Sequence, residues 1–69
     1  MASAKQCIGE IDVVEFAQVV GKWPAGTTGT VVIDFGDAKM IEISNDQGET
    51  LDLPVVSVDK LKLLVKYSD

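Results

Sequence analysis

The sequence has no histidine and no arginine, and among its 69 residues there is a single cysteine, Cys7. Without histidine, the nucleophile–histidine pairs of serine and cysteine hydrolases cannot form. One cysteine cannot close an intramolecular disulfide, and it has no second cysteine or histidine with which to bind zinc. We expect Cys7 to be a structural thiol, with a redox or nucleophilic role as the alternative. We expect no catalytic residue, no metal site and no cofactor.

The missing arginine also bears on possible partners, because eleven acidic residues outnumber six lysines and the net charge is −5. Recognition of phosphates and bases relies on arginine and lysine, and a negatively charged chain is repelled by nucleic acid at long range. Nucleic-acid binding is therefore unfavourable. The acid pairs Glu10/Asp12 and Asp34/Asp37 fall in predicted turns or strand margins, where carboxylates are usually solvated, so we do not expect them to be catalytic.

Long hydrophobic runs are missing as well. No segment approaches the roughly 20 apolar residues of a membrane-spanning helix, and the N-terminal segment lacks the apolar core of a signal peptide. These absences predict a cytoplasmic protein without membrane contact. Aromatic residues make up only 6%, so valine, isoleucine and leucine must fill the core of one small domain. We expect a flexible segment over 1–8 and a folded domain over 9–67.

The sequence does contain short β-branched runs separated by turn residues, a pattern that is typical of strands. Gly26-Thr27-Thr28-Gly29 precedes the longest of these runs, and Asn45-Asp46-Gln47-Gly48 is the strongest hairpin turn. Pro24 prevents regular structure in the long connection over 17–28. Five strands are predicted, over 11–16, 30–35, 39–44, 49–53 and 61–67, with one helical turn over 57–60.

This order of elements favours an all-β fold, a small five-stranded SH3-like antiparallel barrel with a single helical turn before the last strand. Closing the sheet removes edges that so short a chain could not otherwise cover. Asp12 and Glu15 are expected at the solvent side or strand margin, and Val19 and Val20 beneath the first loop. Alternation assigns the interior to Val14, Phe16, Val31, Ile33, Ile41, Ile43, Leu51, Leu53, Leu61 and Leu63.

Four short motifs carry a resemblance to a known family: Asp12-Val13-Val14, Gly29-Thr30-Val31-Val32, Asp46-Gln47-Gly48-Glu49-Thr50 and Asp59-Lys60-Leu61. Their order resembles a family of short bacterial proteins that carries only a domain-of-unknown-function label. The resemblance covers roughly residues 8–64 and implies an SH3-like barrel, with no established activity and no functional residue to transfer. Trp23 departs from this pattern, in which an aliphatic residue is expected. The turn over 26–32 also resembles, more distantly, the strand–turn motif of ribosome-associated KOW barrels.

Surface recognition is the kind of function that this composition leaves. Trp23 lies beside Pro24 in the long loop, and it is either a lid over the end of the core or an anchor for a partner. An outer apolar patch is predicted to extend from this loop through Val32, Met40, Leu64 and Tyr67. Scattered exposed hydrophobic residues are the structural alternative. We predict a non-enzymatic acidic interaction module that binds an unknown protein partner, or itself, through the Trp23 loop and the adjacent apolar surface.

A second candidate surface consists of three of the six lysines, Lys60, Lys62 and Lys66, which share one face of the last predicted strand. Lysines that guard a sheet edge are the structural explanation. Alternatively, these lysines contact an RNA backbone or an acidic protein surface, as in a KOW-like ribosome-associated domain. Salt separates the two main hypotheses, because lysine–phosphate contacts weaken steeply with added salt and an apolar interface changes little.

Overall fold

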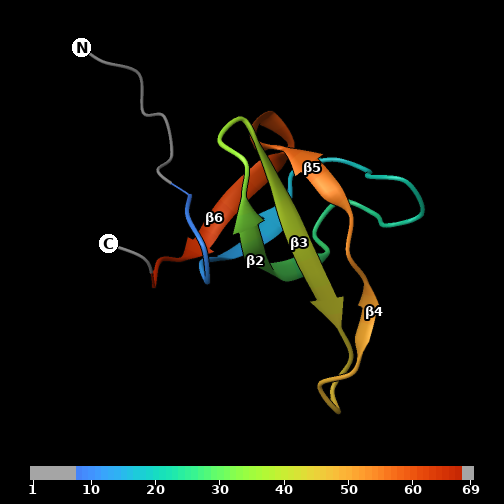
Figure 1. The fold of residues 1–69 in the computed structure, drawn as a ribbon. Helices are drawn as coiled ribbons and strands as arrows, with labels where there is room; N and C mark the ends of the chain where they lie inside the picture. The colour runs from blue at the N-terminus through green and yellow to red at the C-terminus, as the bar shows by residue number, and fades with distance from the viewer. Residues whose placement is uncertain (1–7, 68–69) are drawn as a thin grey trace.

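The computed structural model describes residues 8–67 and shows an antiparallel all-β fold, as the sequence predicts (Figure 1). Its elements are β1 (Val13–Phe16), β2 (Thr28–Asp34), β3 (Ala38–Ser44), β4 (Thr50–Asp52), β5 (Val55–Ser57), the 3-10 turn η1 (Val58–Lys60) and β6 (Leu61–Val65). The expected flexible segment over 1–8 lies outside the described residues, except for Ile8, which is buried in the core.

The strands form one sheet with the order β4–β3–β2–β1–β6, and β5 also pairs with β3. β5 pairs with Ala38 to Met40 at the start of β3, whereas β4 pairs with Ile43 and Ser44 at its end. The predicted fourth strand is thus followed by a further strand that the sequence analysis missed. Pro54 separates the two because it has no N–H to donate, although its carbonyl accepts from Ile41 N at 2.9 Å. The sheet is open, so closure into a barrel is not confirmed.

The core lies on one face of the sheet. Its buried hydrophobic residues are Ile8, Val14, Phe16, Val31, Ile41, Ile43, Val56 and Leu61, with Val20, Trp23, Val58 and Leu63 packed against them. Six of the ten predicted interior residues are in the buried set, and Leu63 is half-buried. These seven lie where side chains alternate regularly between the two faces, so the alternation in the sequence predicts their burial correctly.

Three predicted interior residues, Ile33, Leu51 and Leu53, are exposed. The pairing of β2 with β3 is irregular between Val31 and Ile33, where a bulge resets the alternation of faces. A second irregularity lies in the pairing of β3 with β4: Ile43 and Ser44 pair with Asp52 and Thr50, so Leu51 is the additional residue, and Leu53 follows it. Val56 of β5 fills part of the interior that was assigned to the leucines.

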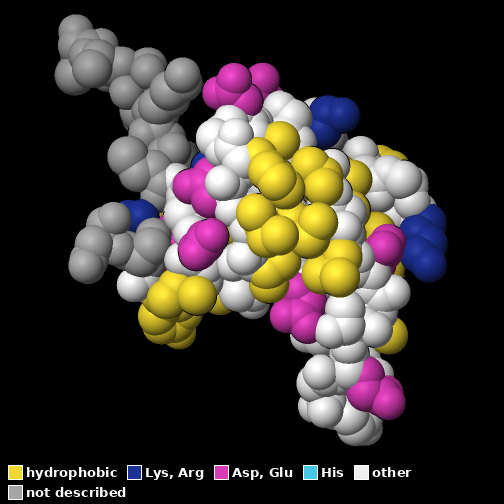
Figure 2. Space-filling model, in the orientation of Figure 1, with side chains coloured by type: hydrophobic (Ala, Val, Ile, Leu, Met, Phe, Trp, Pro, Cys, Tyr) yellow, Lys and Arg dark blue, Asp and Glu magenta, His cyan; other side chains and the backbone are white. Residues whose placement is uncertain are grey.

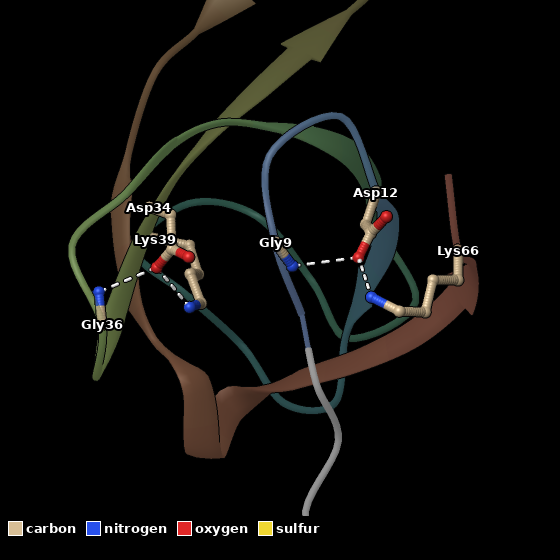
Figure 3. A network of polar contacts seen from close by, with 6 residues as sticks. All are labelled: Gly9, Asp12, Asp34, Gly36, Lys39 and Lys66. Atoms are coloured by element: carbon tan, nitrogen blue, oxygen red, sulfur yellow. Dashed lines mark hydrogen bonds and ion pairs between the residues drawn. The ribbon is translucent and has the colours of Figure 1, made fainter. Parts of the chain in front are cut away.

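Asp12 was expected at the solvent side or strand margin; it does lie at the margin, directly before β1, but its side chain is fully buried and does not face solvent. Ile11 before it has a positive φ of 67°, and the turn there directs the Gly9 N–H to Asp12 Oδ2 at 2.9 Å. The Tyr67 N–H donates to Oδ1 at 2.7 Å, and Lys66 Nζ donates to Oδ2 at 3.2 Å. Figure 3 shows Asp12 between Gly9 and Lys66. The carboxylate is buried because it joins segments from both ends of the described chain.

The first loop contains a tight turn in which Val20 and Trp23 exchange backbone hydrogen bonds of 2.8 Å in both directions. Gly21 in this turn has a φ of 56°, which favours glycine. Val20 packs against the core, as predicted. Val19 is 63% exposed, so its predicted place beneath the loop is wrong. The turn reverses the chain directly after Val19 and leaves that side chain in solvent.

The predicted hairpin turn and helical turn are both present. Asn45 Oδ1 accepts the N–H groups of Gln47 and Glu49 at 2.9 Å each, and Gly48 has a φ of 83°. η1 follows Ser57, whose side chain makes no capping hydrogen bond to the turn. No helix within residues 8–67 is long and apolar enough to cross a membrane.

Candidate interaction surface

A row of aliphatic residues crosses three neighbouring strands on the outer face of the sheet. Ile33 of β2 pairs with Met40 of β3, and Met40 pairs with Val55 of β5. Residues directly opposite in antiparallel strands point to the same face. Because Lys39 and Ile41 on either side of Met40 are buried, Met40 and its two partners point away from the core. We call Ile33, Met40 and Val55 the outer row.

The outer row is open to solvent. Ile33 is 40% exposed and Val55 is 55% exposed, with Met40 half-buried between them. Figure 2 shows hydrophobic side chains gathered in one patch in the middle of the face that carries β2, β3 and β5 in Figure 1. A contiguous exposed apolar patch on a small domain is typical of an interaction site.

The bulge in β2 is the local feature that builds this surface. Strict alternation after Val31 would place Ile33 in the core, whereas the bulge leaves both Val32 and Ile33 exposed. Asp34 is then opposite Lys39, and the two side chains form an ion pair of 2.5 Å. The hydrogen bond from Lys39, and after it the one from the Gly36 N–H, lower the pKa of Asp34 (Figure 3).

The predicted apolar patch is only partly assembled. Met40 belongs to the outer row, and Val32 precedes Ile33 in β2. Leu64 and Tyr67 are exposed, but β1 lies between β2 and β6, so neither joins the row. Leu64 is the additional residue at an irregularity where Val13 and Val14 pair with Val65 and Leu63. The prediction therefore combines residues from two separate regions of the sheet.

Trp23 is half-buried against the core and held by a hydrogen bond, since its indole N–H donates to Asp52 Oδ2 at 2.8 Å. Lys22 Nζ lies 5.2 Å from the centre of the ring. The hydrogen bond from Trp23 is the main cause that lowers the pKa of Asp52, with the Leu53 N–H next. This arrangement favours the lid over the anchor. Pro24 beside it is exposed, and its carbonyl accepts the Thr27 hydroxyl at 2.7 Å.

Two of the three lysines in the alternative surface lie close to acidic residues. Lys62 of β6 is directly opposite Glu15 of β1, and Lys66 pairs with the buried Asp12. Lys60 is exposed in η1. Opposite charges across a strand pair reduce the local positive potential. The structure thus gives this surface less net positive charge than the lysine spacing implies.

Two members of the outer row, Ile33 and Val55, were missed by the sequence analysis. Val55 and Val56 form a β-branched pair directly after Pro54, which is a signal for a short strand that could have been used. Ile33 had no comparable signal, because a bulge in a uniformly apolar run leaves no mark on the sequence.

The acid pairs considered for catalysis do not form a common site. Glu10 is exposed while Asp12 is buried, and Asp34 is paired with Lys39 while Asp37 is exposed in the turn. In the part of the chain that the structure describes, no cluster of three or more acidic, cysteine or histidine residues could hold a metal ion. Comparisons with protein-family models, curated proteins and solved structures found no match to this chain.

Proposed function

We propose that this chain is a non-enzymatic protein-interaction module that binds a protein partner through the outer row. The supporting observation is the register of Ile33, Met40 and Val55 across three adjacent strands, exposed on the face that the core does not use. Burying such aliphatic surface contributes about 25 cal/mol per Å². Ile33 and Val55, which are exposed in the isolated chain, and the open part of the half-buried Met40 gain this contribution only when another molecule covers them.

We propose a supporting role for Trp23 instead of direct contact with the partner. Its hydrogen bond to Asp52 fixes β4, and β4 leads through Leu53 and Pro54 into Val55. The Trp23 loop therefore holds the edge of the sheet that carries one end of the outer row. Pro24 remains exposed and available for contact.

We further propose that the fold is of the SH3-like type. The long first loop, the tight hairpin and η1 directly before the last strand support this assignment. β4 and β5 follow one another along β3 and can be counted as a single bent strand. The six strands then correspond to the five strands of an SH3-like fold. The pairing of the first strand with the last, β1 with β6, is consistent with it.

Affinity capture from a lysate of the native cell with matched variants tests the proposed function. Val55→Thr keeps the shape of the exposed side chain and adds a hydroxyl to the outer row, and Val19→Thr makes the same change in the first loop. We expect a protein that is retained by the wild type and by Val19→Thr but lost with Val55→Thr. Circular dichroism checks that both variants are folded.

The same captured proteins on Val55→Thr as on the wild type would contradict the proposal. RNA that is retained by the wild type, lost with Lys62→Gln and released steeply by salt would replace it with the KOW-like alternative. Sedimentation at several concentrations measures self-association of the same variants. A dimer that Val55→Thr dissociates supports binding through the outer row, with a second copy as the partner.

A further inference from the structure

Acidic residues lie on one side of the outer row, toward the C-terminal end of β3. Glu42 is the only charged residue that β2, β3 and β5 place on the outer face, two positions from Met40 and opposite Thr30. Its carboxylate accepts a hydrogen bond from the Thr50 hydroxyl of β4. The hairpin beyond it contributes Asp46 and Glu49, both exposed. The carboxylates on this side of the row are thus accessible to a partner.

Acidic residues also lie on the other side of the row, before the start of β3. Asp37 is exposed in the turn between β2 and β3, and Asp59 is exposed in η1. The Val58 N–H donates to the Asp37 carbonyl at 2.8 Å, so the turn and η1 are in contact. Lys60 follows in η1 and reduces the charge there without cancelling it. Figure 2 shows acidic side chains above and below the hydrophobic patch.

The basic residue nearest in sequence to the row does not offset these acids. Lys39 precedes Met40, but its side chain is 6% exposed and pairs with Asp34 on the inner face. The bulge in β2 therefore has two effects: it exposes Ile33, and it leaves Asp34 facing the one lysine of β3. The outer face keeps its aliphatic centre and the acidic residues on both sides of it along β3.

From this arrangement, and resting on the proposed function, we infer that the outer row binds a protein segment with apolar residues in its middle and lysine or arginine at both ends. The apolar residues of the segment cover Ile33, Met40 and Val55. Its basic ends lie over Glu42 on one side and over Asp37 and Asp59 on the other. β3 has seven residues, or a length of roughly 20 Å at about 3.4 Å per residue, which about seven residues of extended chain span.

A second copy of this chain does not fit the same surface. Because the row is flanked by acids on both sides along β3, a copy aligned with β3 in either direction places carboxylates opposite carboxylates. Like charges placed together at an interface oppose association. An RNA backbone and an anionic lipid surface are repelled for the same reason. A basic segment with an apolar centre is the occupant whose charge and polarity both match.

Titration of the ¹⁵N-labelled chain with synthetic heptapeptides tests this inference. The first peptide has two lysines at each end and Leu-Val-Leu between them; the second has glutamates at the ends, and the third keeps the lysines but has Ser-Gly-Ser in the middle. We expect the first peptide to shift the amide signals of Ile33, Met40 and Val55 and to bind at least about tenfold more tightly than either control. Raising the salt from low to high concentration should weaken this binding several-fold.

A matched pair of variants locates the basic ends. Glu42→Gln removes the charge next to the row, and Glu15→Gln removes a charge from β1, on the part of the sheet that lacks the row. We expect Glu42→Gln to weaken binding of the lysine-ended peptide about threefold and Glu15→Gln to leave the affinity for that peptide unchanged. Equal loss with both variants would mean that only the net charge of the chain matters, and it would overturn the assignment of the ends.

The outcomes separate this inference from the proposed function. Equal affinity of the lysine-ended and glutamate-ended peptides at the outer row overturns the partner class and leaves the proposed function supported. If the third peptide binds as tightly as the first, both the inference and the proposed function are overturned, because the apolar row would then contribute nothing to binding. Signals of the row that shift with protein concentration and without peptide identify a second copy as the occupant and overturn the inference.

Discussion

On the inner face of β3, Ile41 and Ile43 are buried together with Lys39, whereas on the outer face Met40 lies between the exposed Ile33 and Val55. The inner face accepts a lysine because Asp34 pairs with its ammonium, which offsets the cost of removing the charge from water. The outer face exposes aliphatic side chains that contribute little to folding. The difference teaches that burial in this fold follows pairing and register, and that the stability of the isolated chain does not explain the outer row.

The largest expected difference between the two faces is in the cost of truncation. Ile41 is fully buried, so Ile41→Ala should lower the free energy of unfolding by about 2–5 kcal/mol. Val55→Ala on the outer face should cost less than about 0.5 kcal/mol, because more than half of that side chain is already in solvent. Urea denaturation measures both. Similar costs at the two positions would contradict the assignment of the faces.

The next largest loss of stability is expected at Asp12, whose carboxylate is as deeply buried as the aliphatic side chains of the inner face. Asp12→Ala leaves the N–H groups of Gly9 and Tyr67 without this acceptor and removes the ion pair with Lys66, so we expect a loss of about 2–4 kcal/mol. Asp37→Ala is the control, since that carboxylate is exposed in a turn. Equal midpoints of denaturation for the two variants would show that the buried carboxylate does not hold the ends of the chain together.

Lys39→Met should have a smaller effect, and its sign is informative. Methionine fills the same inner-face position without a charge, and Asp34, with 37% of its side chain exposed, remains partly in water. Replacing a buried ion-pair partner by an apolar side chain of similar size then changes stability by no more than about 1 kcal/mol in either direction. A loss close to that of Ile41→Ala would mean that the ion pair, and not apolar packing, holds this part of the inner face.

The smallest effect concerns acid stability. The pKa values of Asp34 and Asp52 are lowered from 3.8, mainly by hydrogen bonds from Lys39 and Trp23. A carboxylate with a lower pKa in the folded state stabilises the fold above that ordinary value and loses its contribution as the pH falls through the folded value. Unfolding measured from pH 7 downward should therefore show a loss of stability that begins below about pH 4.

Two variants sharpen this acid prediction. Asp52→Asn should make the free energy of unfolding fall less steeply as the pH is lowered. Trp23→Phe should have the same effect, because it keeps an aromatic ring but removes the indole N–H. The double variant should reduce the steepness no further than Trp23→Phe alone. Additive reductions would show that the two residues do not act through their hydrogen bond.

The sequence predicts the buried face of a strand correctly only where the strand is regular. Val14, Phe16, Ile41 and Ile43 were placed correctly because their strands alternate regularly around the core. Ile33 was placed on the wrong face because one bulge reverses every later position of a strand, and bulges leave no pattern in an aliphatic run.

Long-range partners account for the other errors. The burial of Asp12 depends on Lys66 and Tyr67, which are more than fifty positions away, and no local pattern contains that information. Lys39 is buried because the same bulge places Asp34 opposite it. Only Met40 of the outer row was predicted, since assembling the row requires the pairing of β2 and β5 with β3.

Site-specific photo-crosslinking in the native cell tests the binding role of the outer row most directly. A photoreactive side chain is introduced at Val55 in the outer row and, as a control, at Val19 in the first loop, which is at least as exposed. A crosslinked protein partner that appears at Val55 and not at Val19 is the expected result. The same crosslinked products at both positions, or crosslinks at Val19 alone, would contradict a binding role for the outer row.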